Sequence, residues 1–261
     1  MSDSLNARVY CEIKDSIAHL FFNHPQARNA MTQAMYEQLR TICLELAQNS
    51  SVRVAILRGV GGKSFVSGSD IAQFQSFQSG DDGVHYERMI DHYLEPLQQL
   101  PMPTIAVIDG LAVGGGLAIA ALCDFRIATP NAKFGVPIAR TLGNTLSPSN
   151  IAWLTAHLGV AITKRMLLLA ELIPAQELLA QGFVYQTGES EDLNKMSMDL
   201  AKQLTALAPI TQKASKLIVA RVIGNSLPNC DDLINEVYGS LDFKEGVTAF
   251  LAGRSPNWQG K

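Results

Sequence analysis

The sequence predicts an α/β core over residues 1–190 and a helical region over residues 191–261. Up to about residue 190, short apolar runs rich in β-branched side chains alternate with stretches of helical periodicity. This alternation is typical of strands that pair in parallel through crossover connections. Two of the apolar runs are followed directly by glycine clusters, as expected where a strand ends in a sharp turn. After residue 191 the helical periodicity is interrupted only at Pro209 and over residues 225–228.

The individual elements follow from local signals along the chain. Residues 9–13 and 17–22 flank a short polar turn, and their patterning predicts a β-hairpin. Thr32 is suited to cap a helix over residues 33–47, whose apolar side chains recur on one face. Three further strands are expected at residues 52–57, 104–108 and 125–128. Two further helices are expected, one over residues 84–100 and one that runs from the glycine cluster at 114–116 to residue 122.

Composition excludes several classes of protein. The 261 residues carry 21 Lys+Arg against 24 Asp+Glu, a net charge of −3 that offers no basic surface for nucleic acid. The 4 cysteines form no C-x-x-C pair and the 5 histidines show no metal-binding spacing, so no metal site and no redox motif is expected. No apolar stretch reaches about 18 residues, and the polar N-terminus lacks the features of a signal peptide. We therefore expect a soluble cytoplasmic enzyme that has no membrane partner.

The sequence does not match three common nucleotide-binding and catalytic motifs. Residues 59–64 resemble a phosphate-binding loop, but Leu57 stands where that motif needs glycine. Gly114 and Gly116 give G-x-G, but Ile119 occupies the third glycine position of a dinucleotide fingerprint. The G-x-S-x-G elbow of serine hydrolases does not occur. Nucleotide binding and serine-triad chemistry are thus weakly supported.

Two glycine turns have the features of an oxyanion-binding site. Residues 64–71 place a tight turn before an expected helix, and residues 111–118 place three glycines at the start of another. The first amides of a helix have no main-chain partner, and glycine lets a ligand approach them closely. Two such amides that converge on one oxygen would stabilise a developing negative charge. Taken singly, each turn is explained equally well by glycines that pack a helix against a strand.

Four segments, in this order along the chain, resemble characteristic blocks of the enoyl-CoA hydratase/isomerase (crotonase) superfamily. Residues 24–31 (HPQARNAM) are similar to its N-terminal block, and residues 65–71 (FVSGSDI) to its F-S-A-G-A-D-I segment. Residues 103–124, which include the three glycines, resemble its second glycine block. Residues 243–256 resemble its C-terminal E-G-x-x-A-F-L-x-K-R-x-P block.

The resemblance implies a fold, a ligand and an assembly. It implies a spiral of repeated ββα or βαβ turns, with residues 191–261 mediating trimers that often pair into hexamers. The implied ligand is an acyl-CoA thioester, so no separate cofactor is expected because coenzyme A is part of the substrate. Oxyanion donors would be the main-chain amides of Ser69 and Gly115, while Asp70 would cap the following helix. Contacts to the adenine and pantetheine are implied around four residues, Ala27, Arg28, Ser67 and Ile71.

The chain departs from the family where catalytic glutamates are usual. Those two positions hold Ala118 and Ile138, neither of which can transfer a proton. Arg140 could clamp a substrate carboxylate, or it could be a surface or bridging residue. The helix expected over residues 84–100 carries the ionisable residues His85, Glu87, Asp91, His92 and Glu95. Of these, Asp91 and His92 are the best-placed acid–base candidates. The alternative is that these residues form a solvated polar face of the helix. The candidate pocket residues beyond the oxyanion donors are Asp91, His92, Arg140 and Thr145.

These observations leave three functional hypotheses open. The first is an enoyl-CoA hydratase/isomerase-type enzyme, a lyase or isomerase that stabilises a thioester enolate in a backbone oxyanion hole. The second is decarboxylation, thioester hydrolysis or other lyase chemistry on the same scaffold. The third is a catalytically silent subunit that binds acyl-CoA. In each case we expect a homotrimer or a dimer of trimers.

Overall fold

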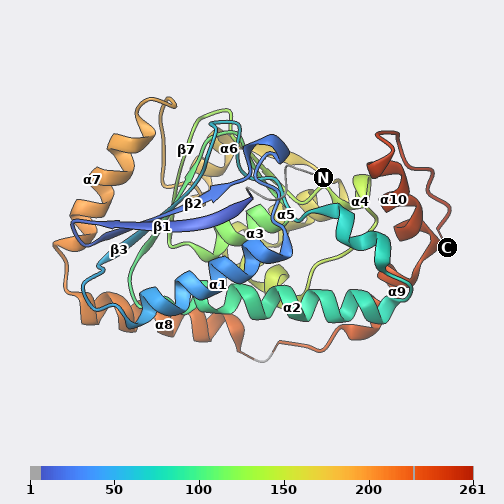
Figure 1. The fold of residues 1–261 in the computed structure, drawn as a ribbon, viewed down its shortest axis with the longest axis horizontal. Helices are drawn as coiled ribbons and strands as arrows, with labels where there is room; N and C mark the ends of the chain where they lie inside the picture. The colour runs from blue at the N-terminus through green and yellow to red at the C-terminus, as the bar shows by residue number, and fades with distance from the viewer. Residues whose placement is uncertain (1–6, 226, 261) are drawn as a thin grey trace.

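The computed structural model describes residues 7–225 and 227–260, which form a mixed α/β fold with two sheets (Figure 1). The larger sheet has six strands in the spatial order β1 (Arg8–Lys14), β2 (Ile17–Asn23), β3 (Val54–Gly59), β5 (Thr104–Ile108), β7 (Phe125–Ala128) and β10 (Gln186–Thr187). The smaller sheet has four, in the order β4 (Ser64–Val66), β6 (Leu111–Val113), β8 (Lys133–Gly135) and β9 (Leu172–Pro174).

Helices connect and cover these strands. The first half of the chain contains η2 (Pro25–Ala27), α1 (Gln33–Gln48), η3 (Ile71–Ser76), α2 (Gly80–Gln98) and α3 (Gly115–Leu122). The second half contains α4 (Ile138–Thr141), α5 (Pro148–Leu168), α6 (Ala175–Ala180), α7 (Leu193–Thr205), α8 (Pro209–Gly224), α9 (Asp231–Gly239) and α10 (Leu241–Leu251).

The chain winds as a spiral, and from β3 to β8 each turn adds one strand to each sheet. β3, β5 and β7 pair in parallel in the larger sheet, whereas β4, β6 and β8 pair in parallel in the smaller one. Each pair of successive strands, such as β5 and β6, is followed by a helix before the next turn begins. The predicted spiral of ββα turns is therefore confirmed.

The larger sheet is covered on both faces. Figure 1 shows α1 and α7 on opposite sides of its strands. Alternate side chains of each strand enter different cores: Ala55 and Leu57 of β3 join the core that includes α1, whereas Val54 and Ile56 join the smaller core that includes α7. Burial of both faces explains why these strands are almost continuously apolar.

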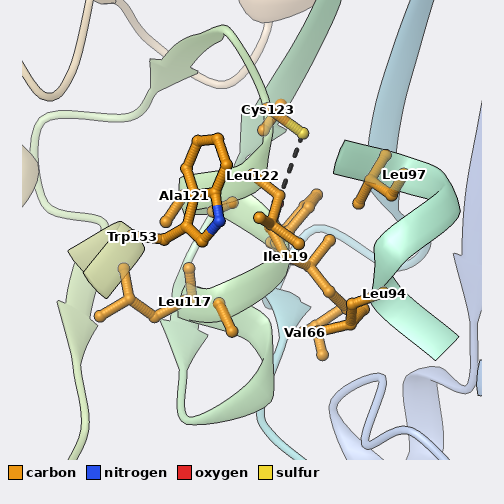
Figure 2. Close-up of a cluster of buried hydrophobic side chains, with 14 of the residues drawn as sticks. Val66, Leu94, Leu97, Leu117, Ile119, Ala121, Leu122, Cys123 and Trp153 are labelled. Carbon is orange, nitrogen blue, oxygen red and sulfur yellow. Dashed lines mark hydrogen bonds between the residues drawn. The ribbon is translucent and has the colours of Figure 1, made fainter. Parts of the chain in front are cut away.

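Helix α3 lies in the interior of the molecule. Its residues from Gly116 to Leu122 are all buried. Figure 2 shows Leu117, Ile119 and Leu122 among side chains of β4, α2 and α5, including Val66, Leu94, Leu97 and Trp153. A helix that is apolar on all sides must be enclosed by protein. This packing fixes where the N-terminus of α3 points.

Most local predictions are confirmed, and two need correction. The hairpin pairs Val9 with Phe22, and the Thr32 hydroxyl accepts a hydrogen bond from the Met35 amide at 3.2 Å as the cap of α1. The helix predicted over residues 84–100 begins earlier, at Gly80, because Ser79 and Asp82 form a capping box before it. The helix expected after residue 70 is the short 3-10 helix η3.

The C-terminal helices pack on two different parts of the molecule, α7 on the larger sheet and α9 and α10 on helices that precede them in the chain. Leu193, Leu200 and Leu204 of α7 pack on the larger sheet. Farther along, α9 contacts α2, and α10 contacts η3 and α4. The boundary at residue 190 stays a prediction, since α7 lies on its C-terminal side yet covers the sheet. Within the described ranges, no helix combines the length and hydropathy needed to cross a membrane.

We expect Gly116→Ala to destabilise the protein strongly. A Cβ atom at this position would lie 2.0 Å from the Val66 carbonyl oxygen, and both residues are buried in the core. Overpacking of this kind costs about 1–3 kcal/mol or more. Gly224→Ala is the matched control, because a Cβ atom there would meet nothing within 4 Å outside its own stretch of helix. Urea denaturation should give a lower free energy of unfolding for Gly116→Ala alone, and equal values for the two variants would contradict the packing described above.

Candidate active site

A cavity of about 510 Å³ lies between the glycine turns, α2 and the C-terminal helix α10. Its wall is mostly apolar, with contributions from Ala118, Ile138 and Leu142, and α10 supplies Phe250 and Leu251. The four residues implied as coenzyme A contacts, Ala27, Arg28, Ser67 and Ile71, all line it, as do Ser69 and Gly115. The cavity thus brings together segments that are far apart in the sequence.

The two glycine turns meet at this cavity. Gly68 has φ +108° and Gly114 has φ +54°, values that L-residues with a side chain rarely adopt. A Cβ atom built on Gly114 would lie 3.6 Å from the Gly68 Cα atom, so the two turns lie side by side with space for about a methyl group between them. The turn at Gly68 is held from the other side, because the Met31 amide donates to the Gly68 carbonyl at 2.8 Å.

Ser69 and Gly115, whose main-chain amides are the expected oxyanion donors, directly follow Gly68 and Gly114 in these two turns. Gly115 is the first residue of α3, whose early amides lack intrahelical partners. Within the described part of the chain, neither the Ser69 nor the Gly115 amide donates to a protein acceptor. The following residue, Asp70, accepts from the Ala72 amide at 3.1 Å as the cap of η3, which confirms its expected capping contact.

Two tyrosine hydroxyls converge on the Ser69 side chain. Tyr86 donates to the Ser69 Oγ at 2.7 Å, and the Tyr36 hydroxyl lies 3.0 Å from the same atom. Burial raises the pKa of Tyr36 to about 12 and also raises the pKa of Tyr86, so both hydroxyls stay protonated. A Cβ atom on Gly115 would lie 2.4 Å from the Tyr36 hydroxyl, so glycine is needed here.

Glu87 is a fully enclosed carboxyl group on the cavity wall. Its side chain is 3% exposed, and it lies on α2 next to Tyr86. The Tyr238 hydroxyl of α9 donates to Oε1 at 2.6 Å, and the Ser147 amide donates to Oε2 at 2.8 Å. Burial raises the pKa of Glu87 to about 8, although these two hydrogen bonds oppose the increase. The cavity therefore contains a carboxylic acid that holds its proton near neutral pH.

The four other pocket candidates lie behind or outside the wall. Asp91 is half-buried one helical turn beyond Glu87, where it accepts from the Ser147 hydroxyl at 2.7 Å, and burial raises its pKa to about 6. His92 and Arg140 are exposed. Thr145 lies on the loop before α5, where its carbonyl is 3.4 Å from the Tyr238 hydroxyl, and it lines a second, apolar cavity. The residues identified as lining the first cavity do not include these four.

Ala118 and Ile138, at the positions where we expected catalytic glutamates to be missing, do line the cavity. Their side chains are buried, at 4% and 8% exposure. Ala118 follows Gly115 by one turn of α3, so this part of the wall is apolar close to the free amides. Among the described residues, no cluster of three His, Cys, Asp or Glu side chains could bind a metal.

From the sequence, Asp91 and His92 are the expected acid–base residues of α2, whereas the structure places their neighbour Glu87 on the cavity wall. The available signal was helical geometry: at about 100° per residue, Glu87 and Asp91 share a face, whereas His92 points elsewhere. The sequence holds no signal for the Tyr238 contact, because the two residues are 151 positions apart.

We expect Glu87 to make the stability of the fold depend on pH. Its pKa rises from an ordinary value of 4.5 to about 8 on folding, so the folded state binds the proton more tightly. The contribution of Glu87 to the free energy of unfolding is therefore fully present below pH 4.5 and is lost as the pH rises toward 8. The loss is at most about 1.4 kcal/mol for each unit by which the two pKa values differ.

Glu87→Gln removes this titration while keeping the shape of the side chain. The free energy of unfolding of the variant relative to wild type should increase by a few kcal/mol between pH 5 and pH 8. Glu95→Gln, on the exposed side of α2, is the matched control and should show no such trend. Chemical denaturation at several pH values measures both, and a flat difference for Glu87→Gln would disprove the buried titration.

Comparison with known proteins agrees with this architecture. The family model for enoyl-CoA hydratase/isomerase matches residues 12–261. A short-chain-enoyl-CoA hydratase of Clostridium acetobutylicum is 30% identical over 250 residues, covering 94% of this chain and 95% of the relative. An (E)-benzylidenesuccinyl-CoA hydratase of Thauera aromatica is 31% identical over 264 residues, covering 97% and 99%.

Solved structures give the same result. A methylmalonyl-CoA decarboxylase in complex with 2-nitronate-propionyl-CoA superposes with a TM-score of 0.88 at 26% identity, covering 97% of this chain and 98% of that one. An enoyl-CoA hydratase/carnithine racemase from Magnetospirillum magneticum has a TM-score of 0.79 at 28% identity, covering 97% and 96%. The sequence match, the spiral of ββα turns and the paired glycine turns agree: the chain belongs to the enoyl-CoA hydratase/isomerase family.

Proposed function

We propose that this chain processes acyl-CoA thioesters through an enolate whose oxygen is bound by the main-chain amides of Ser69 and Gly115. The observation that carries the proposal is that the two glycine turns line one mostly apolar cavity, and that within the described residues the Ser69 and Gly115 amides donate to no protein acceptor. A thioester carbonyl that accepts both hydrogen bonds would gain negative charge as the α-carbon loses a bond. Preorganised donors in a site of low polarity stabilise that charge more than water does.

Decarboxylation is a second candidate for the reaction of that enolate. It is favoured by the apolar wall at Ala118 and Ile138, because loss of CO₂ from a malonyl-type thioester leaves an enolate without the help of a base. Water activation, as in hydration, would need a carboxylate near the β-carbon. Assays with crotonyl-CoA, methylmalonyl-CoA and saturated thioesters separate hydration, decarboxylation and thioester hydrolysis, and tight binding without turnover of any of them would favour a silent binding subunit.

The oxyanion hole can be tested with acetoacetyl-CoA, whose enolate has its own ultraviolet absorbance. We expect the bound ligand to show that absorbance at a pH at which the free thioester is mainly in the keto form. Ser69→Pro removes the amide hydrogen and should reduce the enolate fraction or the turnover by about 100-fold. Ser69→Ala is the matched control, since it keeps the amide and removes only the hydroxyl, and it should lose less than about tenfold. Equal behaviour of the two variants, both folded by circular dichroism, would rule out a role for this amide.

We also propose that the chain forms a homotrimer or a dimer of trimers. Large apolar side chains along α8 are exposed in the single chain: Ile210 (82%), Ile218 (59%), Val219 (53%) and Val222 (72%). Such a row on one helix is costly to leave in water and supports burial against another copy.

Val222→Asp is expected to weaken this association. A charge at the centre of an apolar interface would have to be buried unpaired, which costs several kcal/mol. Light scattering after size exclusion should show a smaller assembly for Val222→Asp, whereas Lys213→Asp, at an exposed polar position of the same helix, should keep the wild-type mass. A monomeric wild type would refute the assembly.

A further inference from the structure

We infer that Glu87 is the acid–base group that exchanges a proton with the α-carbon of the bound thioester. This inference rests on the proposed enolate chemistry and supplies the group that such chemistry still lacks. An enolate left by decarboxylation becomes a stable thioester by gaining a proton at its α-carbon, and main-chain amides cannot provide one. Ala118 and Ile138 cannot provide one either.

Only two of the described residues that line the cavity carry carboxyl groups, Asp70 and Glu87. Asp70 already serves as the cap of η3 through the Ala72 amide and is partly exposed. Glu87 is enclosed, and besides lining the cavity it accepts hydrogen bonds from the Ser147 amide and the Tyr238 hydroxyl. Burial of a carboxyl group without an opposite charge costs folding free energy. A carboxyl group in such a position on the wall of a cavity is therefore a candidate for a functional role.

The position of Glu87 relates it directly to the free amides. Its neighbour Tyr86 donates to the Ser69 side chain at 2.7 Å, so this turn of α2 lies against the first glycine turn. The same helix contacts α3, which begins at Gly115. Because Ser69, Gly115 and Glu87 line the same cavity, a thioester oxygen held by the two amides would place its α-carbon in the space that Glu87 borders.

The two partners of Glu87 suit a group that must exist in both protonation states. The Tyr238 hydroxyl and the Ser147 amide each donate to one carboxyl oxygen, so they orient the carboxylic acid and stabilise the carboxylate left after proton loss. The ionisable groups that face Glu87 are Asp91 and Tyr86 on its own helix, Tyr36 on α1 and Tyr238 on α9. None of them is cationic, which favours the protonated form.

The proposed step balances without a further reactant. The Glu87 O–H bond breaks and a C–H bond forms at the α-carbon, using the electron pair of the enolate double bond. The thioester carbonyl re-forms as its oxygen loses the negative charge, and Glu87 remains as a carboxylate until it takes a proton from solvent. In the reverse direction the carboxylate removes an α-proton and the amides of Ser69 and Gly115 receive the enolate oxygen.

Exchange of α-protons in D₂O tests this assignment. Acetyl-, butyryl-, octanoyl- and phenylacetyl-CoA are incubated with the full chain, and loss of the α-proton signal is followed by nuclear magnetic resonance. We expect wild type to exchange at least one of them and Glu87→Gln to be slower by at least about 100-fold, with thioester affinity changed less than about threefold. Glu95→Gln, the exposed matched control on α2, should exchange like wild type.

Tyr238→Phe separates a chemical role from a structural one. Loss of the donated hydrogen bond destabilises the carboxylate, so the pH at which wild-type exchange rises, near the Glu87 pKa of about 8, should move upward in the variant. A merely structural role would lower the rate without moving the profile.

The outcomes distinguish the inference from the function on which it rests. If none of the thioesters binds to wild type, the proposed function fails. If wild type exchanges α-protons and folded Glu87→Gln exchanges them equally fast, the function stands and the assignment of Glu87 is wrong. Binding without any exchange by wild type also overturns the assignment, as does a pH profile that Tyr238→Phe leaves in place.

Discussion

The close approach of the β4 turn to the start of α3 is the constraint on which the rest of the structure depends. Gly116 lies so near the Val66 carbonyl that no side chain fits between them, and Gly114 lies beside Gly68 with a positive φ. Glycine is selected here by space and by backbone conformation together. Because α3 is packed on all sides by apolar residues, the unpartnered Gly115 amide at its start is held in place on the cavity that Ser69 also lines.

The cavity combines this polar backbone with an apolar wall. Apolar side chains lower the local polarity, which strengthens hydrogen bonds to a developing charge and at the same time raises the pKa of any carboxyl that remains. Glu87 shows both effects, because it keeps its proton and yet has two donors ready for its carboxylate. The tyrosine pair on Ser69 adds hydroxyls that stay protonated, so this part of the wall donates hydrogen bonds without adding charge.

Much of the fold was predictable from local signals, whereas part of the site was not. The hairpin, the Thr32 cap and the strands of the larger sheet follow from patterns spanning a few residues, and the glycine turns were identified because glycine clusters are rare and conspicuous. Local sequence patterns do not single out Glu87, because its environment depends on Ser147 and Tyr238, which reach it only through tertiary packing. The start of α2 at Gly80 differs from the predicted one for a local reason, namely the capping box of Ser79 and Asp82.

The hydrogen bond between Glu87 and Tyr238 joins residues 151 positions apart, one in the first half of the chain and one close to its end. The environment of Glu87 therefore depends on the packing of α9 against α2. Because the Tyr238 hydroxyl is one of the two donors to the Glu87 carboxyl, a local opening that lifts α9 from α2 would remove this donor and expose the carboxyl to water. Such an opening would also remove the burial that raises the pKa of Glu87.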